Sequence, residues 1–102
     1  MNKSHFSKII AGTMSWGVWG KNFNTNEVQR MIQTTVDLGI SSFDHADMYG
    51  GYTTESAFGT AFSRTGISRS SVQFISKCGI QLKTPNRSNE LKHYDCSKAY
   101  II

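Results

Sequence analysis

The stretch that decides the fold is Ser42-Phe43-Asp44-His45-Ala46-Asp47-Met48-Tyr49-Gly50-Gly51. It starts as a short strand, in which alternate residues share a face, and becomes a loop after Asp44. A second stretch of this kind is Phe74-Ile75-Ser76-Lys77-Cys78-Gly79. If the two strands are parallel neighbours, Asp44 and Lys77 emerge together at their carboxyl ends. Ligands bind at that edge in α/β folds.

Strand and helix patterns alternate along the chain. Residues 8–13 form a short apolar run, and residues 72–77 form a third strand. A first helical stripe consists of Val28, Met31, Ile32, Thr35 and Val36, with Asn24 and Glu27 as a capping box and Gly39 at the end. A second stripe consists of Ala57, Phe58, Ala61 and Phe62, with Thr53 or Thr54 as its cap and Gly66 as its terminator. Gly59 inside it predicts a close helix-to-strand contact.

This alternation predicts βαβ units, parallel strands and an α/β fold. Residues 84–89 read as a polar loop, and a third helix begins near Asp95. A (β/α)₈ TIM barrel takes roughly 250 residues. The 102 residues here therefore supply its first three β/α units, an incomplete barrel. We expect residues 1–102 to be the N-terminal part of a single barrel domain, truncated in the third helix.

An acid, a phenol and an amine then meet at the strand ends. A free tyrosine titrates near pKa ~10 and a free lysine near ~10.4, so neither exchanges protons readily at neutral pH. A cation beside a phenol favours the phenolate, and a carboxylate holds a lysine charged and aimed. Asp44 and Lys77 would thus prepare Tyr49 as a general acid, which protonates an oxygen that gains charge during reaction.

These motifs resemble the aldo-keto reductase family. An aspartate and a tyrosine five positions apart, with a lysine 28 residues after the tyrosine, match its signature, as do Glu55, Gly59 and the opening stretch 12–16. The resemblance implies an NADPH-dependent oxidoreductase that reduces an aldehyde or ketone, with Asp44, Tyr49 and Lys77 as catalytic residues. It also implies that Thr13, Met14 and Asp44 contact the nicotinamide ribose side of NADP(H), and that Trp16 or Trp19 walls the carbonyl pocket.

The family has a fourth catalytic residue, a histidine after its fourth strand, and its later cofactor sites follow. None of these matches a residue here, because His5, His45 and His93 all precede that position. We therefore expect the chain by itself to bind NADP(H) weakly or not at all and to be inactive. The sequence leaves open a reductase or its precursor, a non-catalytic remnant that docks onto other chains through its edge strand, and a metal-dependent barrel enzyme.

Composition limits the partners. Eleven Lys and Arg against seven Asp and Glu give a net charge of +4, but the cations are scattered, which argues against nucleic acid. No apolar run approaches membrane-spanning length and no signal peptide is visible, so we expect a cytoplasmic protein with a small carbonyl substrate. Cys78 and Cys96 match neither a metal spacing nor a secreted disulfide framework. Substrate identity, NADPH against NADH and oligomeric state stay open.

Several residues have two interpretations. The cluster Asp44, His45 and Asp47 offers metal ligands, but we expect no metal site, because a strand end rarely aims three neighbours at one ion. His45 is read instead as a hydrogen-bonding group beside the site. Cys78 is read as a small buried core residue rather than a reactive thiol, and Glu55 as a first-turn helix residue. Trp16 and Trp19 suit ordinary packing as well as a pocket.

Overall fold

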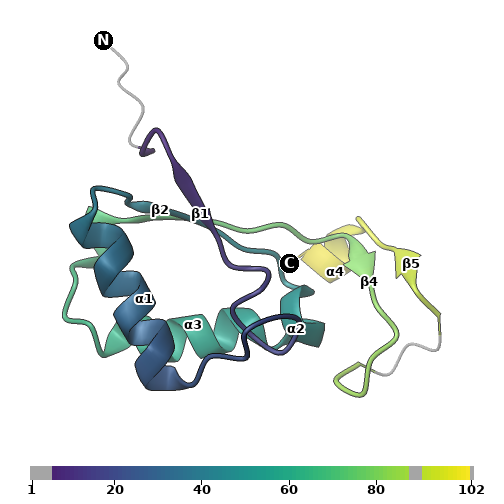
Figure 1. Cartoon of the computed structure of the whole chain (residues 1–102). Coiled ribbons are helices and arrows are strands. Elements are labelled where there is room, and N and C mark those ends of the chain that lie inside the picture. Colours follow the sequence, from purple (N-terminus) through teal and green to yellow (C-terminus); the bar gives the residue numbers. More distant parts are fainter. Residues whose placement is uncertain (1–5, 88–90, 102) are drawn as a thin grey trace, which may run out of the picture.

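The computed structural model describes residues 6–87 and 91–101. Its centre is a parallel sheet in the order β1 (Ile10–Gly12), β2 (Ser42–Asp44) and β3 (Gln73–Ile75). Helix α1 (Thr25–Asp37) connects β1 to β2, while α2 (Tyr49–Tyr52), α3 (Thr54–Ser63) and the 3₁₀ turn η1 (Arg69–Ser71) connect β2 to β3. In Figure 1, α1 and α3 lie on the same side of the sheet. The predicted parallel β/α order is confirmed.

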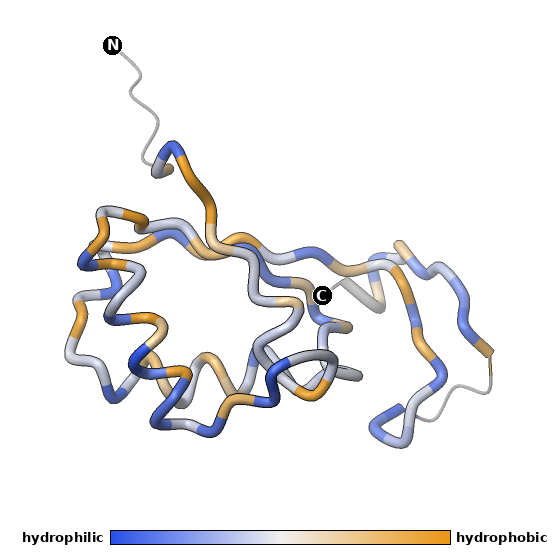
Figure 2. Tube along the Cα trace, viewed as in Figure 1, coloured by the Kyte–Doolittle hydropathy of each residue, from blue (hydrophilic) through white to orange (hydrophobic). Residues whose placement is uncertain are grey.

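The capping box of α1 is formed as predicted. The Asn24 side chain accepts from the Glu27 N–H at 2.9 Å, and the Glu27 carboxylate accepts from the Asn24 N–H at 3.0 Å. Gly39, with φ +86°, follows the last turn. The buried side chains of this helix are Val28, Ile32 and Thr35, whereas Met31 is exposed, contrary to the predicted stripe. Figure 2 shows hydrophobic and hydrophilic positions alternating around α1.

Helix α3 differs from the prediction in its details. Thr53 occupies the N-cap position, but its hydroxyl donates to the Gly50 carbonyl at 2.6 Å instead of capping the helix. Thr54 lies inside the helix and is buried, and Ala57 is exposed. No atom lies within 4 Å of a Cβ placed on Gly59, so the predicted close strand contact is wrong for the described residues.

The hydrophobic core lies between the sheet and these two helices. The register aligns Ala11, Phe43 and Phe74 across the three strands. Phe43 belongs to the buried core cluster, and the partly buried Ala11 and Phe74 pack against it. The largest members of the cluster are Trp16, Ile32, Phe43 and Phe58, of which Ile32 and Phe43 have no exposed surface. Because side chains alternate along a strand, Ser42 and Asp44 occupy the opposite face of β2. The core therefore turns Asp44 away from the helices.

The chain after β3 forms a short hairpin that the sequence did not predict, followed by the predicted third helix. Strands β4 (Ile80–Gln81) and β5 (His93–Tyr94) pair antiparallel, and helix α4 (Lys98–Ile101) follows. Helix α4 begins three residues after Asp95, whose carboxylate accepts from the Ser97 N–H at 3.0 Å. Figure 1 places the hairpin and α4 beyond the carboxyl ends of the parallel strands. Residues 84–87 form the expected loop, while 88–89 lie outside the described residues.

Candidate active site

An ion pair joins the ends of β2 and β3. The Lys77 ammonium lies 2.5 Å from a carboxylate oxygen of Asp44 and also donates to the His45 carbonyl at 2.7 Å. Both side chains are partly open to solvent, at 50% for Lys77 and 35% for Asp44. Strand parity predicts this pairing, and the structure brings the two groups together on one face of the sheet.

The charge of Lys77 is held by its neighbours. Partial desolvation lowers the pKa of the Lys77 ammonium, but the hydrogen bond and the charge of Asp44, together with Tyr49, outweigh it and raise the pKa above its ordinary value. Lys77 is therefore a cation at neutral pH. It presents one fixed positive charge at the strand ends.

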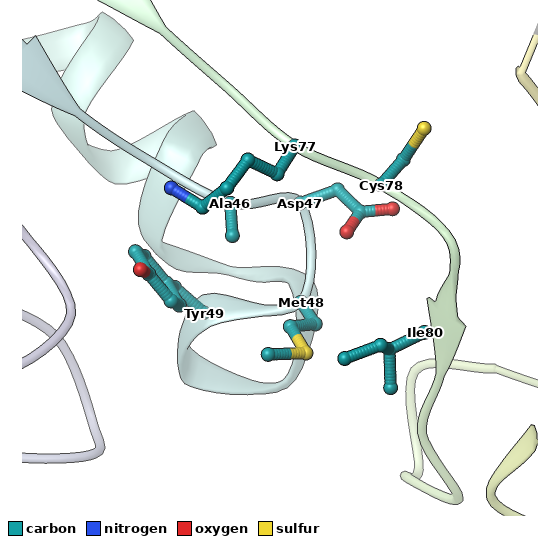
Figure 3. A pocket seen from close by; sticks show the side chains of 7 residues that line it. All are labelled: Ala46, Asp47, Met48, Tyr49, Lys77, Cys78 and Ile80. Carbon is teal, nitrogen blue, oxygen red and sulfur yellow. The ribbon is translucent and has the colours of Figure 1, made fainter. Parts of the chain in front are cut away.

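Tyr49, at the start of α2, lies next to the Lys77 ammonium. The Lys77 nitrogen lies 5.6 Å from the centroid of the Tyr49 ring, and Figure 3 shows the lysine side chain extending toward that ring. Gly50 and Gly51 follow with φ of +64° and +63°, a left-handed conformation that other residues rarely adopt. The double glycine thus turns the chain sharply after Tyr49. The centroid of the Trp19 ring lies 6.2 Å from that of the Tyr49 ring.

A hollow of about 220 Å³ lies beside Tyr49 and Lys77. Its lining comprises Ala46, Asp47, Met48, Tyr49, Lys77, Cys78 and Ile80. Figure 3 shows Tyr49, Met48 and Ile80 along one side of it, with Lys77 and Cys78 above them on the segment between β3 and β4. Sequence reasoning missed Met48 and Ile80 as lining residues. The loop motif contains Met48, but only the bend into β4 brings Ile80 to the hollow.

Hydrogen bonds of Thr13 with Asp44 and His45 hold the end of β2 in place. The Thr13 hydroxyl donates to the Asp44 carbonyl at 3.0 Å, so its single proton is used there, and the His45 Nδ1–H must be the donor in their 3.0 Å contact. His45 is buried against the Phe58 ring, with 4.3 Å between ring centroids. Burial lowers the pKa of His45, which favours the neutral ring, although the charges of Glu55 and Asp44 act in the opposite direction.

Some of the residues expected to face a ligand are buried in the structure, and others are exposed. Thr13 has no exposed surface, so it positions Asp44 and His45 and does not itself face a ligand in this structure. Met14 is 54% exposed and is free to face a ligand. Trp16 is a buried core residue rather than a pocket wall, whereas Trp19 is exposed beside Tyr49.

Cys78 is exposed, so its interpretation as a buried core residue is wrong. Glu55 lies in the first turn of α3, and its carboxylate also accepts a hydrogen bond from the Ser76 hydroxyl, next to Lys77.

Within residues 6–87 and 91–101, no cluster of three or more His, Cys, Asp or Glu side chains could hold a metal ion. No helix in the same ranges is long and apolar enough to span a membrane.

Comparison with known proteins identifies the family. The model of the aldo/keto reductase family matches residues 8–101. The chain belongs to the aldo/keto reductase family. Over 98 residues it is 39% identical to the uncharacterized oxidoreductase YcsN of Bacillus subtilis, covering 95% of this chain and 32% of that protein. Over 97 residues it is 35% identical to the oxidoreductase YdhF of Escherichia coli, again covering 95% of this chain and 32% of the relative.

A third relative carries a more specific name, the 6-dehydroglucose reductase of Agrobacterium fabrum. It is 31% identical over 105 residues, covering 98% of this chain and 34% of that protein. A solved structure from Pseudomonas aeruginosa, described as an aldo-keto reductase, superposes with a TM-score of 0.69 at 23% identity. That match covers 92% of this chain and 32% of the structure. The fold is thus that of the β/α units of an aldo-keto reductase barrel, and the chain spans about a third of the length of these relatives.

Proposed function

We propose that this chain supplies the proton-donating group of an NADPH-dependent oxidoreductase that reduces an aldehyde or ketone to an alcohol. The observation that carries the proposal is the ion pair of Lys77 with Asp44 beneath the Tyr49 ring, at the edge of an open hollow. Family membership supports the same reaction class.

Each residue has a distinct part in the proposed reaction. As hydride reaches the carbonyl carbon, negative charge grows on the carbonyl oxygen, and Tyr49 donates its proton there. The Lys77 cation stabilises the phenolate that remains, and Asp44 keeps the lysine charged and directed. Positioned proton transfer of this kind is typically worth about 10² to 10⁴ in rate.

NADP(H) would supply the hydride when bound, and part of its site fits the residues present. One carboxylate oxygen of Asp44 carries the ion pair, yet the side chain is 35% exposed, which leaves acceptor surface for a ribose hydroxyl. Met14 is exposed after β1, near the same edge of the sheet. We therefore assign the ribose side to Met14 and Asp44, with Thr13 holding the Asp44 backbone in place. The family's adenosine-phosphate groups correspond to none of the residues here.

We propose further that the segment works within a whole barrel. The most direct check is to sequence and express the complete reading frame that contains it. A fourth strand that ends in histidine supports the reductase, whereas a stop codon after Ile102 supports the non-catalytic remnant.

Lys77→Met in that full-length protein tests the role of the cation. We expect turnover of a generic aromatic aldehyde, followed by NADPH absorbance, to fall by about 10² or more, because the phenolate loses its stabilising charge. Lys83→Met makes the same change at an exposed lysine and is the matched control. Equal turnover in the two variants would contradict the assignment of Lys77.

A further inference from the structure

The two cysteines flank the β4–β5 hairpin: Cys78 lies two residues before Ile80, and Cys96 lies two residues after Tyr94. The pair aligns Ile80 with Tyr94 and Gln81 with His93. One step toward the base, this register sets Gly79 against Asp95, and the Asp95 N–H does donate to the Gly79 carbonyl, at 2.6 Å. Beyond this bond the chain is no longer a strand, and the next residues on the two sides are Cys78 and Cys96. The spacing of the two cysteines in the sequence gives no sign of this, because both strands of the hairpin are very short.

The hydrogen-bond pattern makes this a favourable place for a disulfide. Antiparallel partners alternate between hydrogen-bonded and non-hydrogen-bonded pairs, and the latter have Cα atoms about 4.5 Å apart. Gly79 and Asp95 share one backbone hydrogen bond, so Cys78 and Cys96 stand at the positions that a continued ladder would make a non-hydrogen-bonded pair. That separation is within the Cα range of about 4.4–6.8 Å that disulfides span.

The thiol of Cys96 also lies across the hairpin. A Cβ placed on Gly79 would sit 3.1 Å from Cys96 Sγ, and Gly79 itself has φ +120°. Because Gly79 has no side chain, it leaves room for the Cys96 sulfur next to Cys78 in the chain. Both thiols are exposed and free, and Figure 3 shows the Cys78 sulfur directed away from Tyr49. An oxidant therefore has access to both.

We propose that Cys78 and Cys96 are a redox pair that forms an intramolecular disulfide, tying the segment before α4 to the residue next to Lys77. The oxidant is a small disulfide such as oxidised glutathione. One cysteine displaces a glutathione thiolate to give a mixed disulfide. The other cysteine then displaces the second glutathione. Two protein thiols are oxidised and one glutathione disulfide is reduced to two thiols.

The test is a thiol–disulfide equilibrium of the 102-residue chain in mixtures of reduced and oxidised glutathione. After acid quenching and alkylation, mass spectrometry of tryptic peptides identifies the Cys78–Cys96 bond, because Lys83, Arg87 and Lys92 separate the two cysteines in the sequence. We expect the equilibrium constant in buffer to exceed that in about 8 M urea by at least about tenfold, since only the paired hairpin holds the thiols together.

A relocated thiol is the matched control. The double variant C96S/S97C keeps two cysteines but moves one thiol by a single position, away from the place beside Gly79 that Cys96 Sγ occupies. We expect the excess over urea to disappear in this variant. Equal constants for the original chain in buffer and urea, or sulfur bonds found only to glutathione or between chains, would overturn the proposal. Neither carbonyl substrate nor NADPH enters the experiment, so its outcome is independent of the proposed function.

Discussion

At the scale of single residues, the proton on His45 connects stability to pH. Burial lowers the pKa of His45 from its ordinary value of 6.5, so the unfolded chain takes up a proton there that the folded chain resists. The contribution of His45 is therefore complete above pH 6.5 and is lost as pH falls below it. Glu55 and Asp44 limit this loss, because their charges favour the imidazolium, while Lys77 adds to it.

His45→Asn tests this account. The asparagine amide can still donate to Thr13 but cannot titrate. Between about pH 7.5 and 5.5, we expect the free energy of unfolding to fall less in this variant than in the original chain. The difference should be below about 1.4 kcal/mol per pH unit, the limit for one proton. Urea titrations at several pH values measure it. His93→Asn, at an exposed histidine, should keep the original pH dependence, and an equally steep fall in His45→Asn would contradict the account.

At the scale of elements, local signals were readable and long-range ones were not. Asn24 and Glu27 formed the predicted capping box because both partners lie within one turn. Thr53 did not cap α3, because its hydroxyl donates a hydrogen bond to the carbonyl of Gly50, which lies in a left-handed turn. The β4–β5 hairpin escaped prediction because each strand has two residues, too few for a periodic pattern. Cys78 was expected to be buried because the short strand after it gave no pattern that would have indicated its exposure.

The first helix provides a matched pair of substitutions. Asn24→Ala removes the N-cap side chain, and we expect it to reduce the free energy of unfolding by about 1 kcal/mol. Asn26→Ala makes the same change inside the helix at an exposed position, where alanine is the better helix former, so stability should stay the same or rise slightly. Urea denaturation followed by circular dichroism compares the two. Equal losses would show that the capping box adds nothing.

At the scale of the whole molecule, strand parity predicted the meeting of Asp44 and Lys77. Their two strands are neighbours with a fixed register, so the pattern of alternation transfers directly into space. The hollow beside them was not predictable, since Ile80 reaches it only through the bend after Lys77. Trp16 and Trp19 could not be told apart either, because the loop that contains them has no periodicity.

The length of the chain leads to a prediction about cofactor affinity. The described residues offer a ribose edge but no match to the family's adenosine-phosphate groups. We therefore expect calorimetric titration of the 102-residue chain with NADPH to show binding much weaker than about 1 μM. A micromolar or tighter dissociation constant, near −8 kcal/mol, would mean that these residues form a cofactor site by themselves.

The central claim is that Tyr49 donates the proton, and Tyr49→Phe in the full-length protein tests it most directly. The substitution deletes only the hydroxyl, so turnover of an aromatic aldehyde should fall by about 10² or more, while NADPH affinity stays nearly unchanged. Tyr94→Phe, at a tyrosine that is 76% exposed, removes the same atom away from the site and should leave turnover as it was. Near-normal turnover in Tyr49→Phe would contradict the account.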